Sequence, residues 1–121
     1  SGSAACRLEL IEVPPFLLPD NARAVNLMQR QELLGQNHFA MDVTQSIAQD
    51  ASLSNLQDYI ASINRKSIET FGKALRIALQ PQQQMIGNGV FELAFLFDAD
   101  GSLIELLNKQ SELEQTIASG W

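Results

Sequence analysis

Apolar residues recur at helical spacing between positions 54 and 79. Residues that recur every three or four positions lie on one side of an α-helix, so the spacing predicts one long amphipathic helix. Ser54 and Gln57 have the spacing of a capping box at its start, and Pro81 is expected to close it. The apolar stripe of this helix consists of Leu56, Ile60, Ile63, Phe71, Leu75 and Ala78.

The periodicity changes beyond this segment, where apolar residues alternate between positions 90 and 97. Alternation is typical of a β-strand, and one of its two sides carries Phe91, Leu93, Phe95 and Phe97. Residues 98–101 contain an Asp-Gly turn signal, and residues 102–107 are expected to return as a second strand. We expect the helix stripe to pack on the phenylalanine side of this hairpin. The glutamines and glycines before it predict a loop around Met85 and Ile86.

Shorter elements are expected on either side of this helix and hairpin. Residues 21–34 carry a rough apolar face, with a capping residue before it and Gly35 after it, and predict a helix. Residues 36–52 fit two interpretations, a strand through Phe39 and Met41 or a helix that starts at Asp42 or Thr44, and the short helix is favoured. A second capping box at residues 111–114 predicts a short helix over residues 112–118.

These elements predict an α+β fold, in which a long amphipathic helix packs on a small antiparallel sheet with short flanking helices. The 121 residues suit one domain, which we place at residues 6–121. Its expected parts are an N-terminal arm (6–20), a helical region (21–80), and the hairpin with the terminal helix (88–121). Residues 1–5 resemble a cloning remnant, so the sequence is interpreted as the soluble part of a longer protein without its targeting or membrane segment.

The hairpin at residues 90–107 is expected to need a further strand, because two strands alone are marginally stable. Pro14 and Pro15 favour an extended arm over a helix. We therefore expect residues 8–13 to join the sheet as a third strand, or a second protomer to complete it.

The charge balance excludes several classes of function. There are 14 acidic residues against 8 Lys and Arg, a net charge of −6, which argues against general nucleic-acid binding. No stretch approaches the roughly 20 apolar residues that a membrane-spanning helix needs. A single Cys and a single His leave no zinc site built from these residue types and no disulfide within the chain.

No constellation of residues points to catalysis. His38 is the only imidazole, and no serine lies in a nucleophile-elbow motif. Asp98 and Asp100 do not have the spacing of a calcium loop, because glycine comes at the fourth position. We therefore predict no catalytic residue, no metal and no cofactor.

Two groups of residues are candidates for contact with a protein partner. The first is apolar and lies in the N-terminal arm. The second is a local excess of cations between positions 65 and 76, which either forms a solvated helix face or contacts an acidic partner or anionic lipid. The members are Val13, Phe16, Leu17 and Leu18 in the arm, and Arg65, Lys66, Lys73 and Arg76 among the cations.

The order of long helix, glycine-containing loop, hairpin with an Asp-Gly turn, and helix is similar to the C-terminal periplasmic domains of TonB and TolA. The matching residues are 59–63, Ile68 and Phe71 in the helix, and 89–103 in the hairpin, within about residues 53–118. The resemblance implies a periplasmic or cell-envelope adaptor that docks partners by strand addition at an exposed sheet edge.

The leading hypothesis is a noncatalytic interaction module of a bacterial cell-envelope or secretion assembly, which binds through the free edge of the 90–107 hairpin or through the arm. The alternative is an acidic dimeric secretion chaperone that binds an extended client. The alternative location is the cytoplasm. An obligate dimer favours the chaperone and a monomer the adaptor. A small-molecule enzyme or sensor ranks third, and a pocket that gathers His38 with several acids would favour it.

Overall fold

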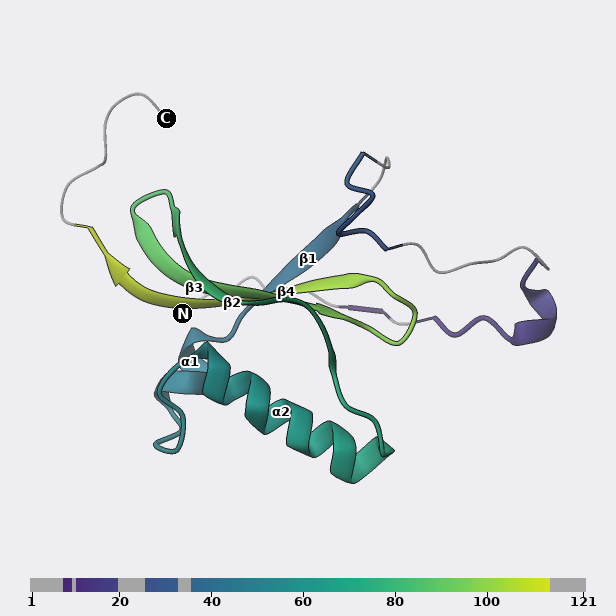
Figure 1. Cartoon of the computed structure of the whole chain (residues 1–121), viewed down its shortest axis with the longest axis horizontal. Helices are drawn as coiled ribbons and strands as arrows, with labels where there is room; N and C mark the ends of the chain where they lie inside the picture. Colours follow the sequence, from purple (N-terminus) through teal and green to yellow (C-terminus); the bar gives the residue numbers. More distant parts are fainter. Residues whose placement is uncertain (1–7, 10, 20–25, 33–35, 114–121) are drawn as a thin grey trace.

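The computed structural model describes residues 8–9, 11–19, 26–32 and 36–113, and the statements below refer to these residues (Figure 1). The chain has an α+β fold with a four-stranded mixed sheet and two α-helices. Its elements in chain order are the 3₁₀-helix η1 (Pro15–Leu17), β1 (His38–Asp42), α1 (Thr44–Ala48), α2 (Leu56–Phe71), β2 (Arg76–Ile86), β3 (Gly89–Phe97) and β4 (Leu103–Glu112).

The sheet has the strand order β1-β4-β3-β2. Strands β2, β3 and β4 form an antiparallel meander, and β1 pairs in parallel with β4. The predicted hairpin is present as β3 and β4, but both strands are interior, so the expected free edge of the 90–107 hairpin is wrong. The strands that complete the sheet are β1 and β2. The expectation that residues 8–13 supply a third strand is also wrong for those described, 8–9 and 11–13, which are not in a strand.

Helix α2 is shorter than the sequence predicted. At its start, the Asn55 side chain accepts a hydrogen bond from the Asp58 N–H, and the Asp58 carboxylate accepts one from the Ser54 N–H. The capping pair is therefore Asn55 and Asp58, one residue further along than the expected Ser54 and Gln57. The helix ends at Gly72, which has a φ of 67° and donates its N–H to the Ile68 carbonyl. Glycine adopts this left-handed conformation without the steric cost of a Cβ atom, which makes it a common helix stop.

The residues beyond Gly72 form a strand instead of the last turns of a helix. Residues 76–79 begin β2, and Pro81 lies inside that strand rather than closing a helix. Met85 and Ile86, expected in a loop, are its last two residues. A two-residue turn then leads directly into β3, with Gly87 at a φ of 60°. The segment had an apolar residue at almost every second position, and pairing with β3 satisfies its backbone as a strand.

Both helices lie on one side of the sheet (Figure 1). The core residues show that this is the side opposite to the predicted phenylalanine side. Leu56 and Ile60 of α2 are buried together with Ala94 and Leu96 of β3 and Leu106 of β4. Ala94 is fully buried, and its small side chain lets the helix approach the sheet closely. The phenylalanines of β3 therefore lie on the other side. There Phe91, Phe95 and Phe97 are half-buried, while Leu93 and Leu103 are buried between strands.

The flanking predictions have mixed outcomes. Residues 26–32, the described part of the helix expected at 21–34, form turns. Both interpretations of residues 36–52 are realised in succession, β1 first and then α1 from Thr44. Residues 112 and 113 are not helical, since β4 runs to Glu112; the rest of the helix expected over residues 112–118 lies outside the described residues.

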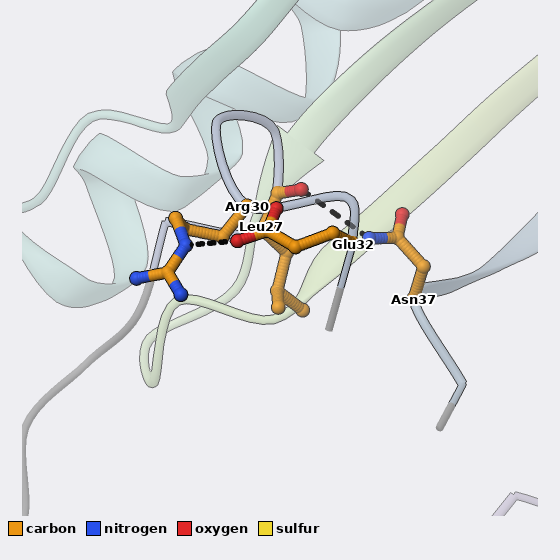
Figure 2. Close-up of polar contacts among 4 residues, drawn as sticks. All are labelled: Leu27, Arg30, Glu32 and Asn37. Atoms are coloured by element: carbon orange, nitrogen blue, oxygen red, sulfur yellow. Dashed lines mark hydrogen bonds and ion pairs between the residues drawn. The ribbon is translucent and has the colours of Figure 1, made fainter. Parts of the chain in front are cut away.

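The turns before β1 are held by local polar contacts (Figure 2). The Asn37 side-chain amide donates a hydrogen bond to the Leu27 carbonyl at 3.3 Å, which ties this segment to the residue before β1. Arg30 forms an ion pair with Glu32, and this contact lowers the pKa of the Glu32 carboxyl. Both side chains are exposed, so the ion pair contributes little to the stability of the fold.

Candidate functional site

Strand β2 forms one outer edge of the sheet. No residue from Ile77 to Ile86 is charged, and residues 82–86 are all exposed. Sheet edges in folded proteins are usually protected by charged side chains, by very short strands or by proline. Within residues 77–86 of β2, only Pro81 has this effect. We call the exposed, uncharged segment of residues 82–86 the β2 edge.

The pairing of β2 with β3 divides β2 into two parts. Register shifts lie between Ile77 and Leu79 and between Leu79 and Gln82. From Gln82 to Ile86 the two strands pair residue by residue up to the Gly87 turn. The β2 edge is therefore the regularly paired part of the strand.

The opposite edge of the sheet, β1, is better protected. It has five residues, and both ends are polar. The His38 Nε2 atom lies 3.1 Å from a Glu105 carboxylate oxygen, and the Asp42 carboxylate accepts hydrogen bonds from the N–H and hydroxyl of Thr44. A short strand with ordered polar ends offers a much weaker template for strand addition.

A groove of about 710 Å³ lies where the end of α2 meets the start of β2 and the β3–β4 turn. Phe71 and Leu75 contribute to its lining, and Phe71 is 74% exposed. The Arg76 guanidinium donates a hydrogen bond to the Asp98 carbonyl and lies 5.5 Å from the centre of the Phe97 ring. Lys73 is the second cation of this lining. We call this feature the α2–β2 groove; its remaining apolar lining comes chiefly from Leu96, Phe97 and Ile104.

The structure brings two of the predicted contact residues together. Lys73 and Arg76 both line the α2–β2 groove. Arg65 and Lys66 are exposed on α2 and do not line it. The arm residues Val13, Phe16, Leu17 and Leu18 are exposed in and around η1.

The sequence does not predict the β2 edge, because its consecutive glutamines favour a loop. A signal for it was present in the Gly87-Asn88 pair, which is a two-residue hairpin signal when apolar residues flank it on both sides.

His38 does not form the pocket that would favour an enzyme or sensor. Its Nδ1 atom lies 2.9 Å from the Asn37 side-chain oxygen, its ring packs edge-on against Phe95, and it does not line the α2–β2 groove. Within the described ranges, no group of three His, Cys, Asp or Glu residues is placed to hold a metal ion. In the same ranges, neither helix has the length and apolarity to cross a bilayer.

Comparison with protein-family models, with curated proteins and with solved structures found no match for this chain. The β2 edge and the α2–β2 groove are therefore the features of this chain that bear on its function.

Proposed function

We propose that this chain is a noncatalytic protein-interaction module that docks an extended segment of a partner by strand addition at the β2 edge. The observation that carries the proposal is the exposed, uncharged run of residues 82–86, which pairs regularly with β3 on one side and has no strand beside it in the described part of the chain. Backbone N–H and carbonyl groups supply most of the affinity in this mode of recognition, so no special side-chain chemistry is required.

The two sides of the sheet would set the side-chain preference of the added strand. Gln82 and Gln84 pair with Leu93 and Phe91 and therefore lie on the phenylalanine side, whereas Gln83 and Met85 lie on the helix side. The side chains of a partner strand next to β2 would alternate between the same two sides of the sheet. Its residues on the phenylalanine side extend a half-buried aromatic surface, which favours apolar side chains there.

The proposed setting is a bacterial cell-envelope or secretion assembly, in the periplasm or at the envelope. Its support is the likeness of the α2, β3 and β4 segments to the C-terminal domains of TonB and TolA, which implies an adaptor that binds by strand addition. The second candidate is an acidic dimeric secretion chaperone for an extended client, and the exposed apolar arm, with Phe16 83% exposed, favours it. An obligate dimer whose subunits do not fold apart would favour the chaperone.

The experiment uses the full chain and a phage-displayed library of extended peptides. Peptides selected on the wild-type chain are then measured against a variant with Gln83→Lys and Met85→Lys, which places two charges on the β2 edge. The matched control carries Gln57→Lys and Ala61→Lys on the exposed side of α2. Thermal denaturation verifies that both variants fold.

We expect the edge variant to bind the selected peptides about tenfold more weakly or worse, and the α2 control to bind them as the wild type does. Failure to select any peptide, or equal binding by the edge variant and the control, would contradict strand addition at β2.

A further inference from the structure

The N-terminal arm exposes a run of large apolar side chains. Within residues 11–18, five large apolar side chains are 48% exposed or more, and Leu8 precedes them at 65%. The arm's backbone hydrogen bonds are internal, from the Leu17 N–H to the Pro14 carbonyl and from the Leu18 N–H to the Pro15 carbonyl. Figure 1 shows the arm extending away from the body of the domain around η1. Single exposed apolar residues need no explanation, but a contiguous group of this kind marks an interaction surface.

The α2–β2 groove has the complementary chemistry. It is mainly apolar, and Phe71 leaves most of its ring exposed beside it. Its volume of about 710 Å³ is large enough for more than one large side chain, since pockets for whole small ligands measure roughly 300–1,000 Å³. Lys73 is exposed at this groove and forms no ion pair with any other described residue.

Charge completes the match between the two surfaces. Positions 8–19 contain Glu9 and Glu12 and no cation, whereas the groove lining has two cations, Lys73 and Arg76, against one acidic residue, Asp98. Glu12 precedes Phe16 by four residues, so an apolar anchor in the groove leaves this carboxylate within reach of a cation beside it. Pro14 and Pro15 restrict the arm before it binds, which lowers the entropy lost on docking.

We propose that the arm of one copy of this chain docks in the α2–β2 groove of a second copy. Phe16 and Leu17 are the apolar anchors, and they contact Phe71 and Leu75 of the other copy. Glu12 pairs with the other copy's Lys73. Because each copy has one arm and one groove, two reciprocal contacts close a symmetric dimer. This surface is separate from the β2 edge, so the proposal does not rest on strand addition.

The first test measures the mass of the full chain by sedimentation equilibrium over a range of protein concentrations. We expect a reversible dimer for the wild type, and a monomer for the variant with Phe16→Asp and Leu17→Asp, with the same melting temperature once both proteins are monomeric. These two residues lie outside the core, so the variant keeps its fold. A wild type that stays monomeric at every concentration, or a variant that still dimerises, would overturn the proposal.

The second test is a charge exchange. We expect Glu12→Lys alone and Lys73→Glu alone each to raise the dimer dissociation constant, by about threefold to tenfold at low salt, and the double variant to recover most of the loss. Lys66→Glu is the matched control, because Lys66 is equally exposed but lies outside the groove lining. An equal effect of Lys66→Glu, or no recovery in the double variant, would contradict the pairing of arm and groove. Peptide binding at the β2 edge is measured on the Phe16→Asp/Leu17→Asp variant, so that a failure of either proposal is seen separately.

Discussion

The Glu92 carboxylate of β3 accepts a hydrogen bond from the backbone N–H of Leu56, the first residue of α2, at 3.1 Å. The same carboxylate oxygen accepts a hydrogen bond from the Asn108 side-chain amide of β4 at 2.8 Å. One side chain thus joins the start of the helix to two central strands. A negative charge at this position also interacts favourably with the positive end of the helix dipole. Glu92 lies on the same side of β3 as Ala94, so this contact and the apolar packing orient α2 on the same side of the sheet.

Removal of this acceptor should weaken the whole fold. We expect Glu92→Ala to lower the free energy of unfolding by about 1–3 kcal/mol, because two donors lose their partner. Glu92→Gln retains an acceptor oxygen and should cost less. Urea denaturation of both variants measures the difference. An alanine variant as stable as the wild type would show that the Glu92 contact does not help to hold α2 in place.

The packing side of α2 can be tested by truncating two residues of the predicted apolar stripe. Leu56 is fully buried and Phe71 is 74% exposed. We expect Leu56→Ala to lower the free energy of unfolding by about 2–5 kcal/mol, as large-to-small changes in a core do. Phe71→Ala should change it by less than about 1 kcal/mol. Similar losses for the two variants in thermal denaturation would contradict the assignment of the core.

Gly72 should be required for the end of α2 because of its backbone conformation. A Cβ atom built there meets nothing within 4 Å, so a substitution meets no steric obstacle beyond the backbone strain. We expect Gly72→Ala to cost about 1–2 kcal/mol, the usual penalty for a left-handed residue with a Cβ atom. Gly72→Asn should recover part of it, since asparagine tolerates this region better. Urea denaturation measures both, and equal stability of the alanine variant and the wild type would contradict a left-handed cap.

The turn between α1 and α2 predicts a specific pH dependence. Hydrogen bonds from the Ser52 hydroxyl and N–H, at 2.6 and 2.9 Å, hold the pKa of the Asp50 carboxyl below its ordinary value of 3.8. A depressed folded-state pKa adds stability that is complete above the unfolded value and is lost as the pH falls through the folded value.

Ser52→Ala removes the hydroxyl and should therefore reduce the acid sensitivity of the fold below about pH 4. We expect its urea midpoint to fall less steeply with decreasing pH than that of the wild type. Ser46→Ala, an exposed serine on α1, is the control and should follow the wild type. If the two variants have the same pH profile, Ser52 does not set the Asp50 pKa.

The sequence predicted the elements that rest on local periodicity. Its predictions for residues 76–86, a helix end followed by a loop, were wrong, because the strand there depends on pairing with β3. The amphipathic pattern of residues 54–79 and the alternation of residues 90–97 each define one element. The structure confirms the strand, and it confirms the helix over Leu56–Phe71 only. The sequence places the end of this helix too late, because residues 75–79 fit both the helical and the strand periodicity. Gly72 is also compatible both with a helix interior, where it weakens the helix, and with a helix end. The larger apolar side of β3 favours packing against the phenylalanines, whereas the core forms on the other side around Ala94 and Leu96.

The candidate surfaces were predictable to different degrees. Lys73 and Arg76 were found from local charge alone, but the groove that joins them to Phe71 and Leu75 forms only when α2, β2 and the β3–β4 turn meet. Strand β1 pairs with the distant β4, and no local pattern indicates that pairing. The edge position of β2 follows from the strand order, which a set of separate elements does not specify.

Backbone amide hydrogen exchange along β2, measured by NMR on the full chain with and without a selected peptide, is the sharpest test of strand addition at the β2 edge. Strand addition predicts that amides within residues 82–86 that exchange rapidly in the free protein become protected at alternate positions when the peptide binds, while α2 changes little. Unchanged exchange along this segment at saturating peptide, or protection confined to α2 or to the α2–β2 groove, would contradict it.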